Sequence, residues 1–307
     1  MPIASLTETL QFASDGFING AFYGLIGLSF GLIVAVTGRF HFAWAVAFAI
    51  SGYFAAYLIN HNQFAILPAV LIGVAGGVLF SVLLELLVYR PVARRAGPNA
   101  LLGVFVASFG ITIAGQALIQ LIVQSRIASE PLNWIPIDSQ DVGGVTFTTL
   151  DIWAVGVFWA CAVLTWALLR FTPLGREIEA VRVNPMMARV VGIRTGRTYV
   201  VVFVIGSLLG GIAAIFFAMD NAATADMGTE PVFYAFVVAF LAGLGSSPLW
   251  IMLVGTLLGV VEGLSAELFS PQWQTVVVFG ILLALLVIKA AHAWRPTVFR
   301  IPAALAR

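Results

Sequence analysis

The sequence predicts an all-α, polytopic membrane protein whose helices form a bundle. Of its 307 residues, 61% are hydrophobic and only 9% are charged, and the mean hydropathy is +1.04. Soluble domains are much less apolar than this. A bilayer contains no water to satisfy loose backbone groups, so helices of about 20 apolar residues are the expected spanning elements. The alternating polarity of transmembrane strands is absent. We therefore expect one transmembrane domain over residues 1–307.

Nine apolar runs have nearly spanning length. They cover residues 16–36, 42–59, 64–88, 100–123, 150–171, 199–219, 232–245, 249–268 and 272–290. The run at 42–59 is short and follows a five-residue gap at 37–41, a pattern also found in broken or re-entrant elements. A turn signal at 245–248 raises the same question for the two runs that it joins. The sequence thus predicts eight or nine crossings.

The basic residues indicate the orientation. With nine crossings and the N-terminus outside, fourteen of the fifteen Lys and Arg residues fall on the cytoplasmic side, and only Arg126 falls outside. Positive charge concentrates in the cytoplasmic loops of membrane proteins. We therefore expect an external N-terminus and a cytoplasmic C-terminus, in a bacterial inner membrane. Residues 1–15 contain no Lys or Arg, which favours a retained first span over a cleaved signal peptide.

The longest outer loop is expected at 124–149. It contains Pro131, Pro136 and the pair Gly143-Gly144. An ordered cap, a partner-docking surface and a simple connector all fit this composition.

Glycines at four-residue spacing mark predicted contacts between helices. They are Gly16, Gly20 and Gly24, then Gly206 and Gly210, then Gly255, Gly259 and Gly263. Small residues at this spacing allow two helix backbones to approach closely in lipid. Glycine is also common in membrane helices generally, but strict spacing favours a packing role.

Several classes of site find no support in the residues. Cys161 is the only cysteine, and His41, His61 and His292 are far apart, so no metal site is expected. No catalytic constellation and no phosphate-binding loop is present, so we expect no enzyme activity and no cofactor bound by this chain. A formal net charge of +1 also argues against nucleic acid as a partner.

A polar segment at 172–198 interrupts the apolar runs. Pro173 and Gly175 mark the exit from the preceding run, and the mixed residues 176–183 are typical of a surface helix. Asn184 is then a natural helix cap and Pro185 suits the first helical position. A second short helix is predicted over 186–191, ended by Gly192.

The second short helix carries adaptable apolar side chains among arginines. Met186, Met187, Val190 and Val191 lie close to Arg189, Arg194 and Arg197. This pattern favours docking into another protein. An interfacial helix held by anionic lipid is the alternative.

Three acidic residues fall within or beside apolar runs. Glu85 is close enough to Arg90 to reach the inner interface, and Glu267 lies near the outer end of its run. Glu262 is the deepest of the three and lies on the glycine-rich face of its run. It fits a pathway residue and a structural hydrogen bond equally well.

Five motifs together resemble the branched-chain amino acid ABC transporter permease family. They are Tyr89-Arg90-Pro91-Val92, Thr172-Pro173-Leu174-Gly175-Arg176, Val191-Gly192-Ile193, Phe203-Val204-Ile205-Gly206, and Gly243-Leu244-Gly245-Ser246 with Pro248. This resemblance covers most of the chain. It implies that the chain is the permease subunit of an ABC importer for a small amino-acid-like solute.

The resemblance also implies roles for residues of the polar segment. Residues 172–198 are similar to the coupling loop that enters a cleft of the cytoplasmic ATPase. The corresponding candidate residues here are Gly175, Arg176, Glu179, Ala180, Asn184, Pro185, Met187, Val190 and Gly192. The implied partners are two ATPase subunits that hold ATP and Mg, a second permease subunit (identical or homologous), and a periplasmic substrate-binding protein.

The chain departs from the family pattern at two places in the expected pathway. The segment His41-Phe42-Ala43-Trp44-Ala45 lies where family members commonly carry Asn-Phe-Ala-His-Gly, and Leu249-Trp250 replace smaller residues after Pro248. The candidate pathway residues are His41, Phe42, Trp44 and Glu262. The bulkier side chains also fit a relative that carries amides, urea or aromatic acids.

Two other functions remain open on sequence grounds. An ion-driven secondary transporter needs acidic residues near the midplane, for which Glu262 is thin support. A passive solute channel is the other possibility.

Overall fold

The fold is described by a computed structural model over residues 6–62, 64–97, 100–123, 138–142, 144–221 and 223–268, with isolated positions at 276, 279–281, 283–284 and 287. The predicted ninth run at 272–290 lies largely outside these residues, and so do Arg126 and the four basic residues from Lys289 onward.

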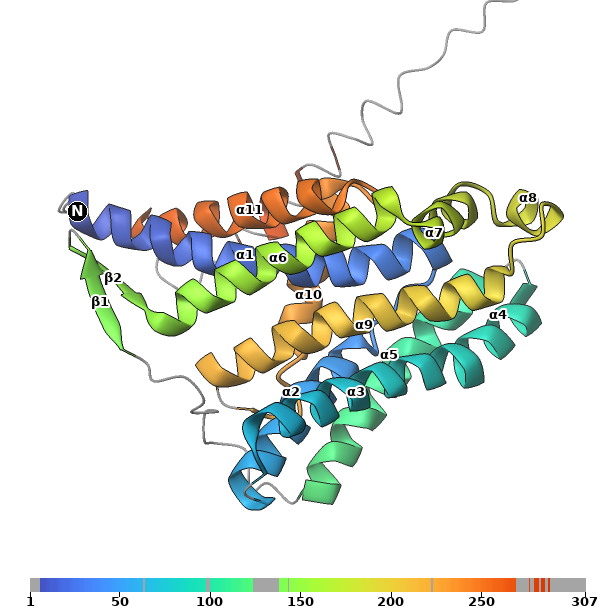
Figure 1. The fold of residues 1–307 in the computed structure, drawn as a ribbon, viewed down its shortest axis with the longest axis horizontal. Coiled ribbons are helices and arrows are strands. Elements are labelled where there is room, and N and C mark those ends of the chain that lie inside the picture. Colours follow the sequence, from blue (N-terminus) through green and yellow to red (C-terminus); the bar gives the residue numbers. More distant parts are fainter. Residues whose placement is uncertain are drawn as a thin grey trace, which may run out of the picture.

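Helices make up almost the whole of the described chain (Figure 1). They are α1 (Leu6–Thr37), α2 (Trp44–Asn62), α3 (Ile66–Leu84), a π-helical turn (Glu85–Tyr89), α4 (Arg90–Ala96), α5 (Ala100–Val123), α6 (Thr149–Phe171), α7 (Pro173–Val183), α8 (Pro185–Val190), α9 (Thr195–Asp220), α10 (Thr229–Ala242) and α11 (Pro248–Leu268). A short hairpin of β1 (Ser139–Val142) and β2 (Val145–Thr148) is the exception to the all-α prediction. It lies in the predicted outer loop at 124–149.

Six helical stretches in the described residues are long and apolar enough to cross a membrane. They are Thr7–Thr37, Ile66–Ala96, Ala100–Leu121, Thr149–Phe171, Thr195–Asp220 and Pro248–Ser265. Two shorter apolar helices, Trp44–Asn60 and Thr229–Ala242, occupy two further predicted runs. A polytopic helical membrane protein is thus confirmed, whereas the number of crossings stays a prediction.

Helix α1 forms the centre of one half of the bundle. It packs against α6, α9, α10 and α11, and its residues Leu25, Ile26 and Phe30 are fully buried. Helices α2, α3 and α9 pack together beside it. Helices α3, α5 and α6 present exposed leucines such as Leu79, Leu121 and Leu164. These leucines are suited to contact with lipid.

The spaced glycines of α1 and α11 lie at one antiparallel crossing. A side chain added at Gly255 would overlap the backbone of Gly24, and one at Gly259 would overlap the backbone of Gly20. A side chain at Gly16 would likewise meet the Gly259 carbonyl oxygen at 2.5 Å. The two backbones are therefore in direct contact, with no room for a methyl group between them.

The other glycine pair allows α9 to approach two further elements. The Ser29 hydroxyl of α1 donates a 2.6 Å hydrogen bond to the Gly206 carbonyl. A side chain at Gly210 would lie 2.8 Å from the Trp44 indole nitrogen. Gly206 and Gly210 thus accommodate α1 and the start of α2.

The α1–α11 crossing gives a direct test of packing. Gly255→Ala is expected to destabilise the protein by about 1–3 kcal/mol, because the backbones must separate to admit the methyl group. Gly110→Ala is the matched control, since a side chain there meets nothing within 4 Å. Unfolding of the purified variants by heat in detergent measures both effects. Equal transition midpoints for Gly255→Ala and the parent would contradict close packing at this crossing.

Candidate coupling segment and outer cavity

Helix α7 is fixed at its start by local chemistry. The backbone N–H of Gly175 donates to the Thr172 side chain at 3.1 Å, and Pro173 occupies the first turn. This cap starts the helix three residues earlier than the sequence suggested. Gly175 lies directly on the backbone of Leu169, where any side chain would overlap. The start of α7 is therefore packed directly against the last turns of α6.

Helix α7 has a buried face and an exposed face. Gly175, Ile178 and Val181 are buried against the bundle. Arg176 is exposed, and Ala180 is partly buried. The helix is therefore anchored to the bundle along one side.

Helix α8 (Pro185–Val190) lies one residue earlier than the predicted range 186–191. The Asn184 side-chain oxygen accepts hydrogen bonds from the backbone N–H groups of Met186 and Met187, at 3.0 and 3.1 Å. Pro185 lies in the first turn, and Gly192 has a φ of +91°, a left-handed conformation suited to glycine. These three residues mark the two ends of the helix.

The apolar side chains of α8 are left exposed by this chain. Met187 is 63% exposed and Val190 is 77% exposed, with Met186 and Val191 similarly open, whereas Ala188 is buried. Figure 1 shows α7 and α8 together at one end of the molecule. Such a patch at the end of the bundle is typical of an interaction site.

An ion pair within α7 lies next to the turn between α10 and α11. The Arg182 guanidinium donates to both Glu179 carboxylate oxygens, at 2.8 and 2.5 Å. These hydrogen bonds lower the pKa of Glu179 and raise that of Arg182. The same guanidinium lies where a side chain on Gly245 would be, and Gly245 has a φ of +82°. The Arg182 side chain of α7 is therefore packed closely against this turn.

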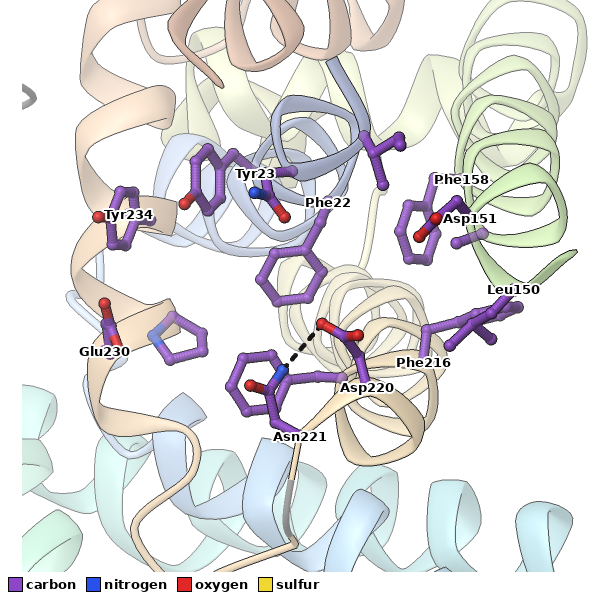
Figure 2. A pocket seen from close by; sticks show the side chains of 15 residues that line it. Phe22, Tyr23, Leu150, Asp151, Phe158, Phe216, Asp220, Asn221, Glu230 and Tyr234 are labelled. Atoms are coloured by element: carbon purple, nitrogen blue, oxygen red, sulfur yellow. Dashed lines mark hydrogen bonds between the residues drawn. The ribbon is translucent and has the colours of Figure 1, made fainter. Parts of the chain in front are cut away.

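A cavity of about 350 Å³ lies beside the N-terminal half of α1. Its lining comes from α1 (Ile18, Asn19, Phe22, Tyr23), α6 (Leu150, Asp151, Ala154, Phe158), α9 (Phe216, Phe217, Asp220) with Asn221, and α10 (Glu230, Pro231, Tyr234). Figure 2 shows carboxylates from three of these helices around the Phe22 ring. The lining contains aromatic rings and carboxylates but no cationic side chain.

The cavity wall is organised by ring stacking and hydrogen bonds. Phe22 stacks on Phe217 with their centroids 5.6 Å apart. Tyr23 stacks on Tyr234 at 4.3 Å. Asn221 donates to the Asp220 carboxylate at 3.3 Å. From the sequence, the three cavity carboxylates could be assigned only to outer segments. A single sequence does not show which helices lie next to one another, so their meeting in one cavity could not be predicted.

The candidate pathway residues lie elsewhere. His41 is fully buried and hydrogen-bonded to the Tyr89 hydroxyl at 2.8 Å. Trp44 is also buried and donates from its indole N–H to the Ser29 hydroxyl at 2.8 Å. Phe42 packs against the rings of Phe30 and Phe105, among others. None of the three lines the cavity, and a pathway role for them stays a prediction.

Glu262 does not line the cavity but lies next to tyrosines that do. Tyr234 donates a 2.8 Å hydrogen bond to its carboxylate, and the Tyr234 ring stacks on Tyr23. Both tyrosines line the cavity. Of the two roles open on sequence grounds, this geometry favours the structural hydrogen bond.

Sequence reasoning missed a buried charge network at the other end of the bundle. The Glu85 side chain is fully buried and forms ion pairs with Arg39 and Arg90. Arg90 also donates to the Gly196 carbonyl at the start of α9. The Glu85–Arg90 proximity was visible in the sequence, but Arg39 lies 46 residues before Glu85 and had no visible link to it.

Comparisons with known proteins identify the chain's relatives. Residues 12–286 match the family model described as branched-chain amino acid transport system / permease component. The high-affinity branched-chain amino acid transport system permease protein LivH of Salmonella typhimurium is 28% identical, over 95% of this chain and 97% of LivH. Protein BraD of Pseudomonas aeruginosa, which carries the same description, is 28% identical over 91% of this chain and 94% of BraD.

A third relative bears a different name. The galactofuranose transporter permease protein YtfT of Escherichia coli is 26% identical, over 87% of this chain and 72% of YtfT. No solved structure matches the chain. Because the family model covers nearly all of the helical bundle, this chain belongs to the permease family of the branched-chain amino acid transport systems.

Proposed function

We propose that this permease forms the translocation pathway of an inner-membrane ABC importer for an amino-acid-like solute. A second permease subunit completes the pathway, two cytoplasmic ATPases bind ATP and Mg, and a periplasmic protein delivers the solute. The observation that carries this proposal is α8, which presents Met187 and Val190 to the surroundings while α7 is anchored to the bundle. Exposed apolar side chains on α8 can bind the ATPase, and the packing of α7 against the bundle can transmit a movement of the bound ATPase to the permease.

The distribution of charge supports an external N-terminus. The arginine-bearing elements α4, α7 and α8 gather at one end of the molecule, and the N-terminus and the hairpin lie at the other (Figure 1). The carboxylates of Asp151, Asp220 and Glu230 line the cavity near that second end. The positive-inside rule then places α7 and α8 in the cytoplasm. A crossing by residues 272–290 would complete nine spans and return the C-terminus to the cytoplasm.

Deletion of the segment that carries α7 and α8 tests whether the ATPase docks there. Removal of residues 176–194 is expected to abolish co-purification of the ATPase with the permease. Uptake that persists without the ATPase but stops with a protonophore would instead support an ion-driven secondary transporter. Uptake that persists under both conditions would support a passive channel.

The outer cavity supports a solute with an amine and an apolar side chain. LivH and BraD are named for branched-chain amino acids and YtfT for a sugar. In this chain, rings such as Phe22 and Phe217 can contact an apolar side chain, while Asp220 and Glu230 can accept hydrogen bonds from an ammonium group. A neutral sugar has no cation for these carboxylates. We therefore infer a branched-chain amino acid or a close relative as the solute.

Neutralising a cavity carboxylate should weaken transport. Asp220→Asn is expected to reduce uptake about tenfold at a solute concentration below saturation, because a hydrogen bond to a charged group contributes about 1.5–3 kcal/mol. Asp226→Asn is the matched control, since Asp226 is exposed and does not line the cavity. Uptake of radiolabelled leucine, with permease abundance measured in parallel, checks the result. Equal uptake by the two variants would exclude Asp220 from solute binding.

A further inference from the structure

A second cavity lies at the arginine-rich end of the bundle. It has a volume of about 290 Å³. Its lining comes from four parts of the chain: Arg39 before α2, Arg90, Ala93 and Arg94 of α4, Arg189 of α8, and Thr195, Gly196 and Tyr199 of α9. Four guanidinium groups therefore line one small space, and no carboxylate from the described part of the chain lines it.

Two of these arginines are engaged by the protein. Arg39 and Arg90 both pair with the buried carboxylate of Glu85. Arg39 also lies over the Tyr199 ring, 5.1 Å from its centroid, and Arg90 donates to the Gly196 carbonyl. The network holds this side of the cavity in place and neutralises only part of its charge.

The other two arginines have no acidic partner in the described chain. Neither Arg94 nor Arg189 lies within 4.0 Å of a described carboxylate. Among the described residues, the Arg189 guanidinium donates only to the Pro185 carbonyl and the Met186 sulfur of its own helix, at 3.3 and 3.8 Å. Helix α9 starts beside them, and its cap residue Arg194 makes no side-chain cap hydrogen bond. Uncompensated positive charge therefore faces the cavity from several elements.

Exposed leucines lie close to this charge. Leu87 is 69% exposed, and Leu83 and Leu86 are also open, all within three turns of Arg94 along one continuous helical stretch. This stretch has the composition of a membrane-spanning helix. The cavity thus lies beside apolar surface at the end of a span, where lipid headgroups are found.

From this arrangement, we propose that the cavity binds a phosphate group, held by Arg94 and Arg189 against the Arg39–Arg90 wall. Arginine presents several donors in a fork that matches phosphate oxygens, and a phosphate can accept from several arginines at once. The exposed leucines favour an anionic phospholipid as the source of the phosphate, with its acyl chains along α3. Inorganic phosphate has the same chemistry without the chains. The proposal does not depend on which solute the permease carries.

The test compares lipid retention by the intact permease with and without the free arginines. The full-length protein is purified in mixed micelles of phosphatidylglycerol and phosphatidylcholine, and its bound lipids are counted by native mass spectrometry. The R94Q/R189Q double variant is expected to lose the preference for phosphatidylglycerol at least tenfold, about the effect of one charge-assisted hydrogen bond. The R95Q variant is the matched control, because Arg95 is exposed on the same helix but does not line the cavity.

A parallel calorimetric titration with sodium phosphate separates the two sources. A lipid preference lost only in R94Q/R189Q identifies the phospholipid. Phosphate binding lost only in that variant, without a lipid preference in the parent, identifies the free ion. Unchanged lipid retention and phosphate binding in R94Q/R189Q would overturn the proposal. If that variant loses only the co-purified ATPase, the arginines bind an acidic protein segment and the proposal is equally wrong.

Discussion

Met187→Ser combined with Val190→Ser is expected to abolish co-purification of the ATPase while the permease stays folded. The two side chains are 63% and 77% exposed, so their loss leaves the bundle intact. The Asn184 cap and the buried Ala188 still hold α8 in place. Burial of each apolar side chain in a partner contributes about 2 kcal/mol, so the double variant should bind about a thousandfold more weakly.

The matched control for this experiment is Val183→Ser. Val183 is 72% exposed but belongs to the end of α7, outside the proposed knob. Pull-down of the ATPase with each permease variant, at equal permease abundance, provides the comparison. If the double variant retains the ATPase as fully as Val183→Ser does, α8 is not the docking element.

Glu85→Ala is expected to cause the largest loss of stability. Its carboxylate is fully buried and forms ion pairs with both Arg39 and Arg90. Removing it leaves the Arg39 side chain, only 10% exposed, without its counter-ion. A buried ion pair broken in this way usually destabilises a protein by about 3–5 kcal/mol.

An exposed ion pair provides the comparison for Glu85. Glu179 also pairs with an arginine, but its side chain is 57% exposed, so Glu179→Ala should change stability by only about 0.2–1 kcal/mol. Thermal unfolding of both variants in detergent measures the difference. A Glu85→Ala protein as stable as Glu179→Ala would show that the Glu85 network contributes little to the fold.

Local chemistry allowed parts of the fold to be predicted closely. The boundaries of α8 follow from Asn184, Pro185 and Gly192, and all three act within a few residues of their own position. The long helices follow from composition, because a spanning segment must satisfy its own backbone groups. Helix α2 begins directly after the gap at 37–41, because the backbone N–H of Trp44 bonds the His41 carbonyl at 3.0 Å.

The sites depended on contacts that no local pattern contains. The outer cavity joins residues of α1, α6, α9 and α10, and the basic cavity joins Arg39 to Arg189. Glu85 could be linked to Arg90 five residues away but not to Arg39. The deep position of Glu262 was visible, yet its partner Tyr234 lies on another helix 28 residues earlier. A single sequence therefore does not predict contacts between helices that are far apart in the chain.

Helix α8 must lie in the cytoplasm if a motor protein is to reach it. The chain has a single cysteine, Cys161, so a Cys161→Ser background allows one new thiol to be placed at Val190 and, separately, at the exposed Gln140 of the hairpin. A membrane-impermeant maleimide should label Val190→Cys only in inverted membrane vesicles and Gln140→Cys only in right-side-out vesicles. Labelling of Val190→Cys from the outside would contradict both the orientation and the importer mechanism.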